Sequence, residues 1–322
     1  MEFLYLLEKI RNPIFDFFFS LITYFGDELV FLTVAIFVFW CVDKRRGYYI
    51  LTVGLLGTVL NQALKIIFRI DRPWVKDPNF KPIENAIEAA SGYSFPSGHT
   101  QNVTGTFGSI AATSKRNAGR IFCAVMIVIV AFSRMYLGVH TPLDVGVSLV
   151  LGTALVFAFY PLFKSEERFR RCMPYVVVAC TAVSVLFVLF VVLMPKEGLD
   201  PHNLESAMKN AGTLLGCTAG LVAVYFVDAK YIGFRTDAPW YFQIVKLVFG
   251  LLIVLGIKSG LSAPLTALFG NEYVARGVRY FLIVIFSGLV WPLTFNYFAT
   301  HRIAKLDALG EKIAARLKSK KV

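Results

Sequence analysis

The stretch Gly92–Asn102, GYSFPSGHTQN, interrupts a chain that is otherwise largely apolar. Within it, Pro96, Ser97, Gly98 and His99 stand directly before a segment rich in threonine and glycine. A helix that begins there presents free backbone N–H groups, which favour an anion. A glycine also lets the backbone approach a ligand closely. We therefore predict that this turn holds a phosphate group.

The composition is that of a membrane protein. Of the 322 residues 57% are hydrophobic and 17% are charged, whereas roughly 25% of residues are charged in a typical soluble domain. Several apolar stretches are long enough to cross the apolar core of a bilayer, which is about 30 Å thick. We predict an all-α polytopic transmembrane helical bundle with about nine spans. The candidate spans are 29–42, 48–68, 98–113, 121–138, 143–163, 172–194, 211–227, 243–258 and 278–298.

Other segments are less typical of spans. Residues 1–12 place apolar side chains on one helical face, which indicates a helix lying in the membrane interface. Segment 14–25 is short for a span, and 259–277 is either a loop or a short re-entrant piece. Segment 98–113 is the least apolar candidate and suits a helix packed inside the bundle. The helical face near the N-terminus is formed by Phe3, Leu6, Leu7 and Ile10.

The net charge of +12 follows the membrane topology. Lysines and arginines gather in the loops after every second span and in the tail, a distribution that argues against nucleic acid. By the positive-inside rule these loops and the C-terminus are cytoplasmic. Loops 69–97, 139–142 and 195–210 then face the opposite side. The tail carries an apolar stripe among its basic residues, formed by Ile303, Leu306, Ile313 and Leu317, and it predicts a basic amphipathic helix on anionic lipid.

Three polar clusters fall at the same predicted face. The first, KIIFRIDRP, contains Lys65 and Arg72, and the second is the PSGH turn. The third, SRMYLGVHTPLD, is the longest. Cations brought together there repel one another unless an anion bridges them, and phosphate suits both arginine and lysine. The polar residues of the third cluster are Ser133, Arg134, His140 and Asp144.

Each cluster taken alone has an ordinary structural explanation. A lysine near a span end, such as Lys65, commonly reaches to the interface. Ser97 can simply cap the following helix. Thr141, Pro142 and Asp144 are typical of a helix start. The five cysteines lack metal-ligand spacing and are typical of buried thiols.

Together the clusters resemble a known family. The pattern Lys-x6-Arg-Pro, Pro-Ser-Gly-His and Ser-Arg-x5-His-x3-Asp is similar to that of the type 2 phosphatidic acid phosphatase superfamily, which includes lipid phosphate phosphatases, glucose-6-phosphatase and vanadium haloperoxidases. Every signature position is filled in this sequence. The expected organisation is an N-terminal interfacial segment at 1–28, a phosphatase core at 29–163, additional transmembrane helices at 164–298 and a basic amphipathic cytoplasmic tail at 299–322.

The resemblance implies a mechanism. His140 is the expected nucleophile, which forms a phosphohistidine, and Asp144 fixes its tautomer. His99 is the expected general acid and then the general base. No metal or cofactor is implied, so metal-independent hydrolysis is expected. The phosphoryl group is expected to be held by Lys65, Arg72, Ser97, Gly98 and Arg134.

The location of the clusters favours a lipid-borne phosphate, because groups at span ends lie at headgroup depth. Membrane lipids are the expected partners, nucleic acid is not, and the oligomeric state is left open. The stretches YSFPSGH and SRMYLGVHTPLDV are also similar to those of sphingosine-phosphate phosphatases. The composition suits a bacterial plasma membrane, with the active site extracytoplasmic, and an endoplasmic reticulum location with the site facing the lumen would have the same topology.

Three alternatives remain at this stage. The chain could hydrolyse a soluble phosphomonoester, as glucose-6-phosphatase does, or pass the phosphoryl group to another hydroxyl. It could also be a non-catalytic protein that binds or transports lipid. The presence of His99, His140 and Asp144 argues against that last alternative. A soluble haloperoxidase does not fit so apolar a chain.

Overall fold

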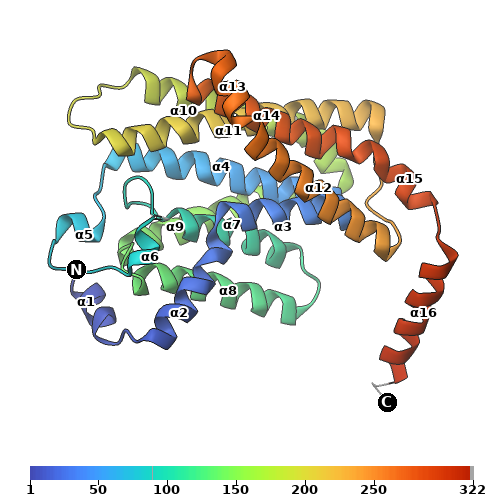
Figure 1. Ribbon diagram of the computed structural model, residues 1–322, viewed down its shortest axis with the longest axis horizontal. Helices are drawn as coiled ribbons and strands as arrows, with labels where there is room; N and C mark the ends of the chain where they lie inside the picture. The colour runs from blue at the N-terminus through green and yellow to red at the C-terminus, as the bar shows by residue number, and fades with distance from the viewer. Residues whose placement is uncertain (89, 320–322) are drawn as a thin grey trace.

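A computed structural model describes residues 1–88 and 90–319. Every regular element in these residues is a helix, and the longest helices run side by side in one bundle (Figure 1). The all-α prediction is therefore confirmed. The elements are α1 (Glu2–Lys9), α2 (Pro13–Ile22), η1 (Thr23–Gly26), α3 (Glu28–Cys41), α4 (Lys44–Phe68), α5 (Pro73–Lys76), α6 (Glu84–Glu88), α7 (Gly98–Thr113), α8 (Asn117–Tyr136), α9 (Pro142–Phe163), α10 (Glu166–Leu193), α11 (Pro201–Val227), η2 (Asp228–Ile232), α12 (Trp240–Gly260), α13 (Ser262–Phe269), α14 (Glu272–Ile285), η3 (Phe286–Val290), η4 (Trp291–Thr294), α15 (Phe295–Thr300) and α16 (Ala304–Ser319).

The described residues contain seven helices long and apolar enough to cross a membrane, or up to eight if a bent pair forms one span. This is a multi-pass membrane bundle. The expected number of about nine spans included segment 98–113, which forms the 16-residue helix α7. This helix packs against α4, α8 and α9 and buries threonines as well as apolar side chains. As predicted from its small and weakly polar residues, α7 lies inside the bundle.

The N-terminal segment packs on α8. The hydroxyl of Tyr136 donates to Asp16 Oδ1 at 2.7 Å, and Arg11 Nε donates to the carbonyl of Tyr136 at 3.1 Å. Leu4 and Leu7 are buried. Three of the four residues of the predicted interfacial face are exposed, namely Phe3, Leu6 and Ile10, whereas the prediction was wrong for Leu7, which packs against the protein. Helices α2 and α3 form the bent pair, with an angle of 51° between them.

Helix termini converge at the end of the bundle that carries α5 and α6 (Figure 1). Helix α4 ends there because Arg69 adopts the left-handed conformation, with φ of 51°. Ser97 caps the start of α7, and its side-chain oxygen accepts from the backbone N–H of Thr100. Thr141 and Asp144 form a capping box at the start of α9. These local signals bring the three polar clusters to one end.

The C-terminal helices pack closely through glycines. Gly212, Gly216 and Gly220 recur at every fourth residue of α11 and face α14, where a Cβ on Gly216 would lie 2.0 Å from the carbonyl oxygen of Gly277. Only a residue without a side chain permits that approach, as is common between membrane helices. Helix α10 also packs against α11.

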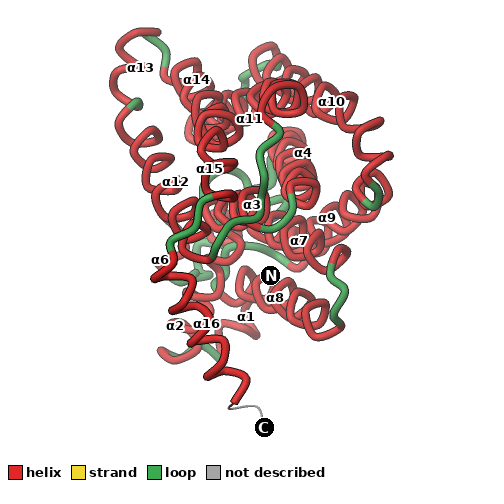
Figure 2. Tube along the Cα trace, turned by 90° about the vertical axis from the view of Figure 1, so that its right-hand side faces the viewer, coloured by secondary structure: helices red, strands yellow, loops and turns green. Residues whose placement is uncertain are grey.

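The ambiguous segments have defined structures, and 14–25 forms most of α2 and η1. Segment 259–277 contains the short helix α13, which connects α12 to α14. The tail forms α16, which extends away from the bundle (Figures 1 and 2). Ile313 on α16 and Ile303 just before it are exposed, whereas the side chain of Leu317 lies outside the described residues. The contact of this tail with anionic lipid stays a prediction. The last part of the predicted tail, residues 320–322, lies outside the described residues.

Candidate active site

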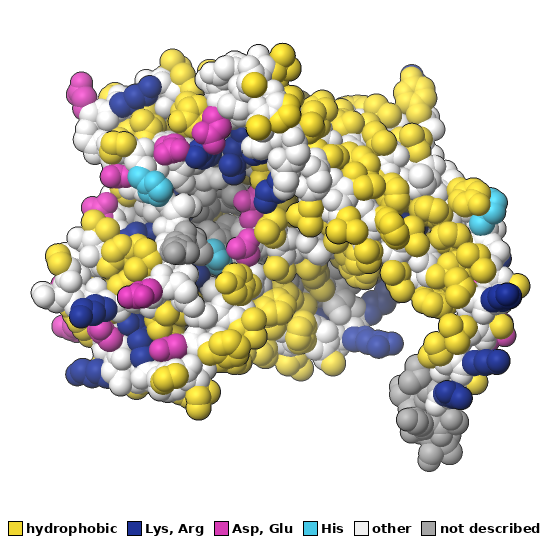
Figure 3. Space-filling view, viewed as in Figure 1, with side chains coloured by type: hydrophobic (Ala, Val, Ile, Leu, Met, Phe, Trp, Pro, Cys, Tyr) yellow, Lys and Arg dark blue, Asp and Glu magenta, His cyan; other side chains and the backbone are white. Residues whose placement is uncertain are grey.

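A polar cavity of about 200 Å³ lies where these helix termini meet. In the space-filling view, charged side chains and a histidine surround a hollow at this end of the molecule, whereas hydrophobic side chains cover its middle (Figure 3). The cavity is lined by residues from all three sequence clusters. Those lining residues are Lys65, Arg72, Gly98, His99, Arg134 and His140.

His140 is buried in the short loop between α8 and α9. Its Nε2 lies 3.0 Å from an Nη1 of Arg72, and its Nδ1 lies 3.5 Å from Oδ2 of Asp144. Because a guanidinium can only donate, Nε2 must be the accepting nitrogen and the ring proton is on Nδ1. The lone pair of His140 therefore points towards Arg72, and both residues line the cavity.

The pKa of His140 lies well below its usual range. Burial is the largest cause, and three nearby cations lower it further. Burial disfavours the charged imidazolium because it removes water, and positive neighbours repel the added proton. The imidazole is therefore neutral at pH 7, which a nucleophilic histidine requires. The three cations are Arg72, Arg134 and Lys65.

Asp144 is held by several donors. Its Oδ2 accepts from the backbone N–H of Thr141 at 2.7 Å and from the hydroxyl of Ser94 at 2.6 Å. The same carboxylate therefore closes the capping box of α9 and faces the imidazole of His140. The helix-start interpretation of Asp144 is confirmed, and it does not compete with an orienting role.

The three cations are buried and held mainly by backbone carbonyls. Arg72 donates to the carbonyls of Gly92, Val139 and Ser91 at 2.8 to 3.0 Å. Lys65 donates to the carbonyls of Tyr93 and Ser94. Neutral partners leave the positive charge available to an anion.

Arg134 connects the site to the N-terminal segment. Its Nη1 donates to the hydroxyl of Thr23 at 2.6 Å. Gly26 packs so closely on His99 that an added Cβ would lie 2.8 Å from the His99 Cβ. Asp27 also lines the cavity. Although residues 1–28 lie outside the signature motifs, they form one wall of the site.

Two residues of the PSGH turn lie at the cavity as expected, whereas the side chain of Ser97 does not. Gly98 and His99 line the cavity. The side chain of Ser97 is fully buried and accepts from the backbone and the hydroxyl of Thr100, and it is not among the cavity-lining residues. Its capping role is confirmed, whereas contact between its hydroxyl and a phosphate stays a prediction.

Two buried amides in the cavity wall were not singled out from the sequence. Asn61 and Gln101 are 1% and 2% exposed and line the cavity, and within the described residues neither amide has a hydrogen-bond partner. Leaving such a group without a partner costs about 1–3 kcal/mol. These amides are therefore available to a substrate or to water. A signal existed for Asn61, which precedes Lys65 by one turn of α4 on the same face.

Comparisons with known proteins identify the family. Residues 46–168 match the PAP2 superfamily, and residues 208–303 match the transmembrane extension of PAP2 superfamily phosphatases. The chain belongs to the PAP2 superfamily. This confirms the resemblance seen in the sequence motifs, all of which lie within the first match. The second match covers most of α11 and continues through α15, so these helices are a known extension of the superfamily.

Individual PAP2 relatives are distant. The chain is 25% identical over 277 residues to sphingosine-1-phosphate phosphatase 1 of Rattus norvegicus, covering 79% of this chain and 61% of the relative. It is 29% identical over 129 residues to phosphatidylglycerophosphatase B of Bacillus subtilis, covering 37% and 62%. It is 24% identical over 277 residues to a dihydrosphingosine 1-phosphate phosphatase of Schizosaccharomyces pombe, covering 80% and 64%. The chain therefore spans less than two thirds of the length of these relatives. No solved structure matches it.

The described residues offer no group of three or more histidine, cysteine, aspartate or glutamate side chains that could hold a metal ion. In this PAP2 site the positive charge comes from Lys65, Arg72 and Arg134. Hydrolysis without a metal stays a prediction from the resemblance.

Proposed function

We propose that this PAP2 protein hydrolyses the phosphomonoester of a membrane lipid through a phosphohistidine intermediate on His140. The observation that carries the proposal is the convergence on one cavity of a neutral imidazole, a second histidine and three buried cations. A phosphate monoester carries up to two negative charges and three acceptor oxygens, which match these groups.

The first step transfers the phosphoryl group to the enzyme. His140 Nε2 attacks phosphorus, and the bond between phosphorus and the lipid oxygen breaks. His99, protonated once the phosphate dianion of the substrate offsets the charge of the neighbouring cations, gives its proton to that leaving oxygen. The Nδ1 proton of His140 faces Asp144, which stabilises the positive ring as the new bond forms. Lys65, Arg72, Arg134 and the Gly98 N–H would hold the phosphoryl oxygens.

The second step releases phosphate. His99, now neutral, takes a proton from a water molecule, and the resulting hydroxide attacks phosphorus and breaks its bond to Nε2. Inorganic phosphate leaves, and both histidines return to their starting states. No proton or electron is left unbalanced over the cycle.

The relatives and the place of the site support a lipid substrate. The names of the PAP2 relatives describe phosphatases of sphingosine-1-phosphate and phosphatidylglycerophosphate, which are lipids. The cavity lies at the ends of membrane-crossing helices, where a headgroup can enter while the tail stays in the apolar region. The charge of the loops supports an extracytoplasmic site, with the C-terminus cytoplasmic.

The test is phosphate release by the purified protein in detergent with EDTA, from a long-chain lipid phosphate. The wild type is expected to release phosphate and His140→Ala is not. His202→Ala is the matched control, because His202 is exposed and does not line the cavity. In His99→Gln, the transferred phosphoryl group is expected to accumulate on His140 and to be found by mass spectrometry. Full activity in His140→Ala would refute the mechanism, and no release by the wild type would favour the binding alternative.

A further inference from the structure

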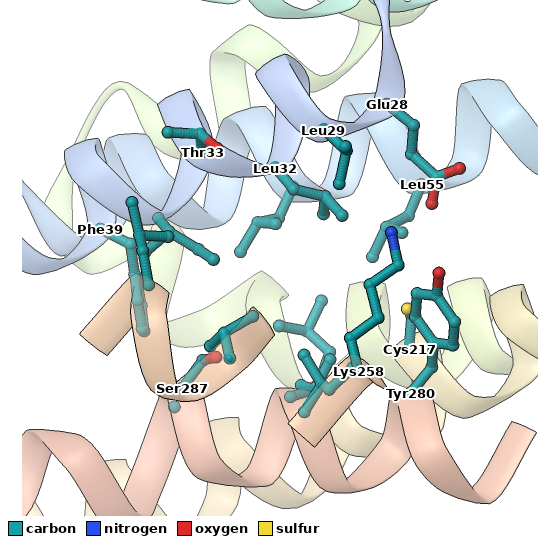
Figure 4. Close-up of a pocket in the computed structure, with 18 of the residues that line it drawn as sticks. Glu28, Leu29, Leu32, Thr33, Phe39, Leu55, Cys217, Lys258, Tyr280 and Ser287 are labelled. Carbon is teal, nitrogen blue, oxygen red and sulfur yellow. The ribbon is translucent and has the colours of Figure 1, made fainter. Parts of the chain in front are cut away.

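A second and larger cavity lies beside the catalytic one. It measures about 630 Å³ and is enclosed by α3 and α4 of the core and by α11, α12 and α14 of the transmembrane extension (Figure 4). We call it the apolar chamber. Most of its lining side chains are hydrophobic, among them Leu32, Ile36, Leu221, Val254 and Ile283.

The chamber and the catalytic cavity share part of their walls. Asp27 and Glu28, at the start of α3, line both cavities. The two cavities are therefore adjacent at these two carboxylates, which a molecule reaching from His140 into the chamber would pass. The order along this route is a cationic phosphate site, an acidic pair and then a hydrophobic wall.

The dimensions of the chamber suit one hydrocarbon chain. Its lining residues on α3 run from Glu28 to Phe39, which is roughly 16 Å at about 1.5 Å per helical residue. One leaflet contributes half of the roughly 30 Å apolar core, so a tail of one leaflet has this reach. A volume of about 630 Å³ also lies within the roughly 300–1,000 Å³ typical of a single ligand site.

The chamber wall is partly open. Leu29 on α3 and Leu255 on α12 both line it, and each is 49% exposed. Near the acidic end, Lys258 extends its amine towards Glu28 and Leu55 (Figure 4). Arg276 also lines the chamber. Basic side chains near the catalytic end would draw an anionic headgroup towards this opening.

We propose that the apolar chamber holds one hydrocarbon chain of the substrate while its phosphate occupies the catalytic cavity. The inference rests on the proposed function and extends it to the substrate class, a lipid phosphomonoester with a chain that lies inside the protein. The transmembrane extension is then part of the substrate site, because α11, α12 and α14 form most of the chamber wall.

The chamber positions the chain and adds little affinity. Lipid tails are as apolar as the leucines that line the chamber, so moving a chain from bilayer to chamber gains little. A chain fixed in the chamber nevertheless orients the phosphate towards His140, and a misplacement of about 1 Å can cost about 100-fold in rate. Filling the chamber should therefore impair long-chain substrates selectively.

The test uses two leucines of α12 that differ in whether they line the chamber. Leu255 lines it and Leu252 does not, although their exposures are similar at 49% and 59%. Leu255→Trp is expected to lower kcat/KM for a single-chain lipid phosphate with a long chain by about tenfold or more. The kcat/KM for a four-carbon alkyl phosphate is expected to change less than about twofold, because this substrate does not reach the chamber. Leu252→Trp is expected to leave kcat/KM unchanged for both substrates.

If Leu255→Trp lowered kcat/KM equally for long-chain and short-chain substrates, or for neither, the proposal would be overturned while the phosphatase function remained intact. No release from any substrate by the wild type would instead refute the proposed function. Labelling of His140→Ala with a lipid phosphate that carries a photoreactive group at the chain end gives a second measurement, independent of turnover. Cross-links are expected near Leu221 and Ile283, and cross-links confined to the outer surface would contradict the proposal.

Discussion

His140 Nδ1 and Asp144 Oδ2 lie 3.5 Å apart, across the start of α9. The same oxygen accepts from the backbone N–H of Thr141 at 2.7 Å, so one carboxylate both caps the helix and faces the proposed nucleophile. The cap fixes the position of Asp144 before any substrate binds. The orientation of His140 is thereby tied to the beginning of a membrane helix.

Replacing Asp144 should separate catalysis from capping. Asp144→Asn keeps an oxygen for the cap and removes the negative charge that favours the Nδ1–H tautomer and the positive ring. We expect kcat to fall by about 10²–10⁴-fold, as for related orienting carboxylates. Steady-state phosphate release measures this effect.

Thr141→Ala is the control for the cap. It removes the hydroxyl that accepts from the Asp144 N–H at 3.3 Å, and we expect a loss of about 1 kcal/mol of stability. Its kcat should stay within a few-fold of the wild type. If Asp144→Asn proved no less active than Thr141→Ala, Asp144 would be a structural residue only.

The lowered pKa of His140 predicts its chemical reactivity. A base with a lowered pKa stays neutral at lower pH, so the reactive form is lost only when the pH falls below the usual histidine range near 6.5. Modification by diethyl pyrocarbonate, followed at the His140 peptide by mass spectrometry, should therefore show a midpoint below pH 6.5. Exposed His202 serves as an internal reference within the same samples. A His140 midpoint at or above pH 6.5 would contradict the proposed effect of the cations.

The glycine contact between α11 and α14 predicts a stability effect. An alanine at Gly216 would place its Cβ 2.0 Å from the carbonyl oxygen of Gly277, so the two helices must separate. We expect a loss of about 1–3 kcal/mol, the usual cost of overpacking, seen as a lower Tm in detergent. Gly256→Ala is the control, since nothing lies within 4 Å of its added Cβ. Equal Tm values for the two variants would show that the contact does not limit stability.

Much of the site could be predicted from the sequence because its residues lie at helix ends. Capping signals at Ser97 and Thr141 mark where α7 and α9 begin, and loop charge indicates which ends share a face. Asn61 was not predicted, although its place one turn before Lys65 on α4 could have indicated it. By contrast, the contact of Arg134 with Thr23 joins residues 111 positions apart, and no local sequence pattern indicates it.

The arrangement of the helices in the transmembrane extension could not be predicted from the sequence. Its apolar sequence indicates membrane helices, but hydropathy alone does not say which helix faces which. The spacing of Gly212, Gly216 and Gly220 does indicate a close helix contact, although it does not identify α14 as the partner. The apolar chamber arises from the packing of five helices and leaves no pattern in any one of them.

The acidic pair between the two cavities predicts a preference among lipid phosphates. Glu28 is exposed and lies where the atoms joining phosphate to chain would pass. We expect Glu28→Gln to lower kcat/KM roughly two- to fivefold for a single-chain lipid phosphate with an ammonium group next to the phosphate-bearing carbon. This range follows from the roughly 0–1 kcal/mol value of exposed ion pairs. For the amine-free analogue with the same hydrocarbon chain, kcat/KM should change little in Glu28→Gln.

Glu272→Gln is the matched control for this prediction. Glu272 is also exposed and lies 3.3 Å from Lys209, but it lines neither cavity. Because salt screens exposed charges, the effect of Glu28→Gln should shrink as ionic strength rises. An equal loss for the amine-bearing and amine-free substrates would mean that Glu28 supports the cavity wall and does not recognise a cation.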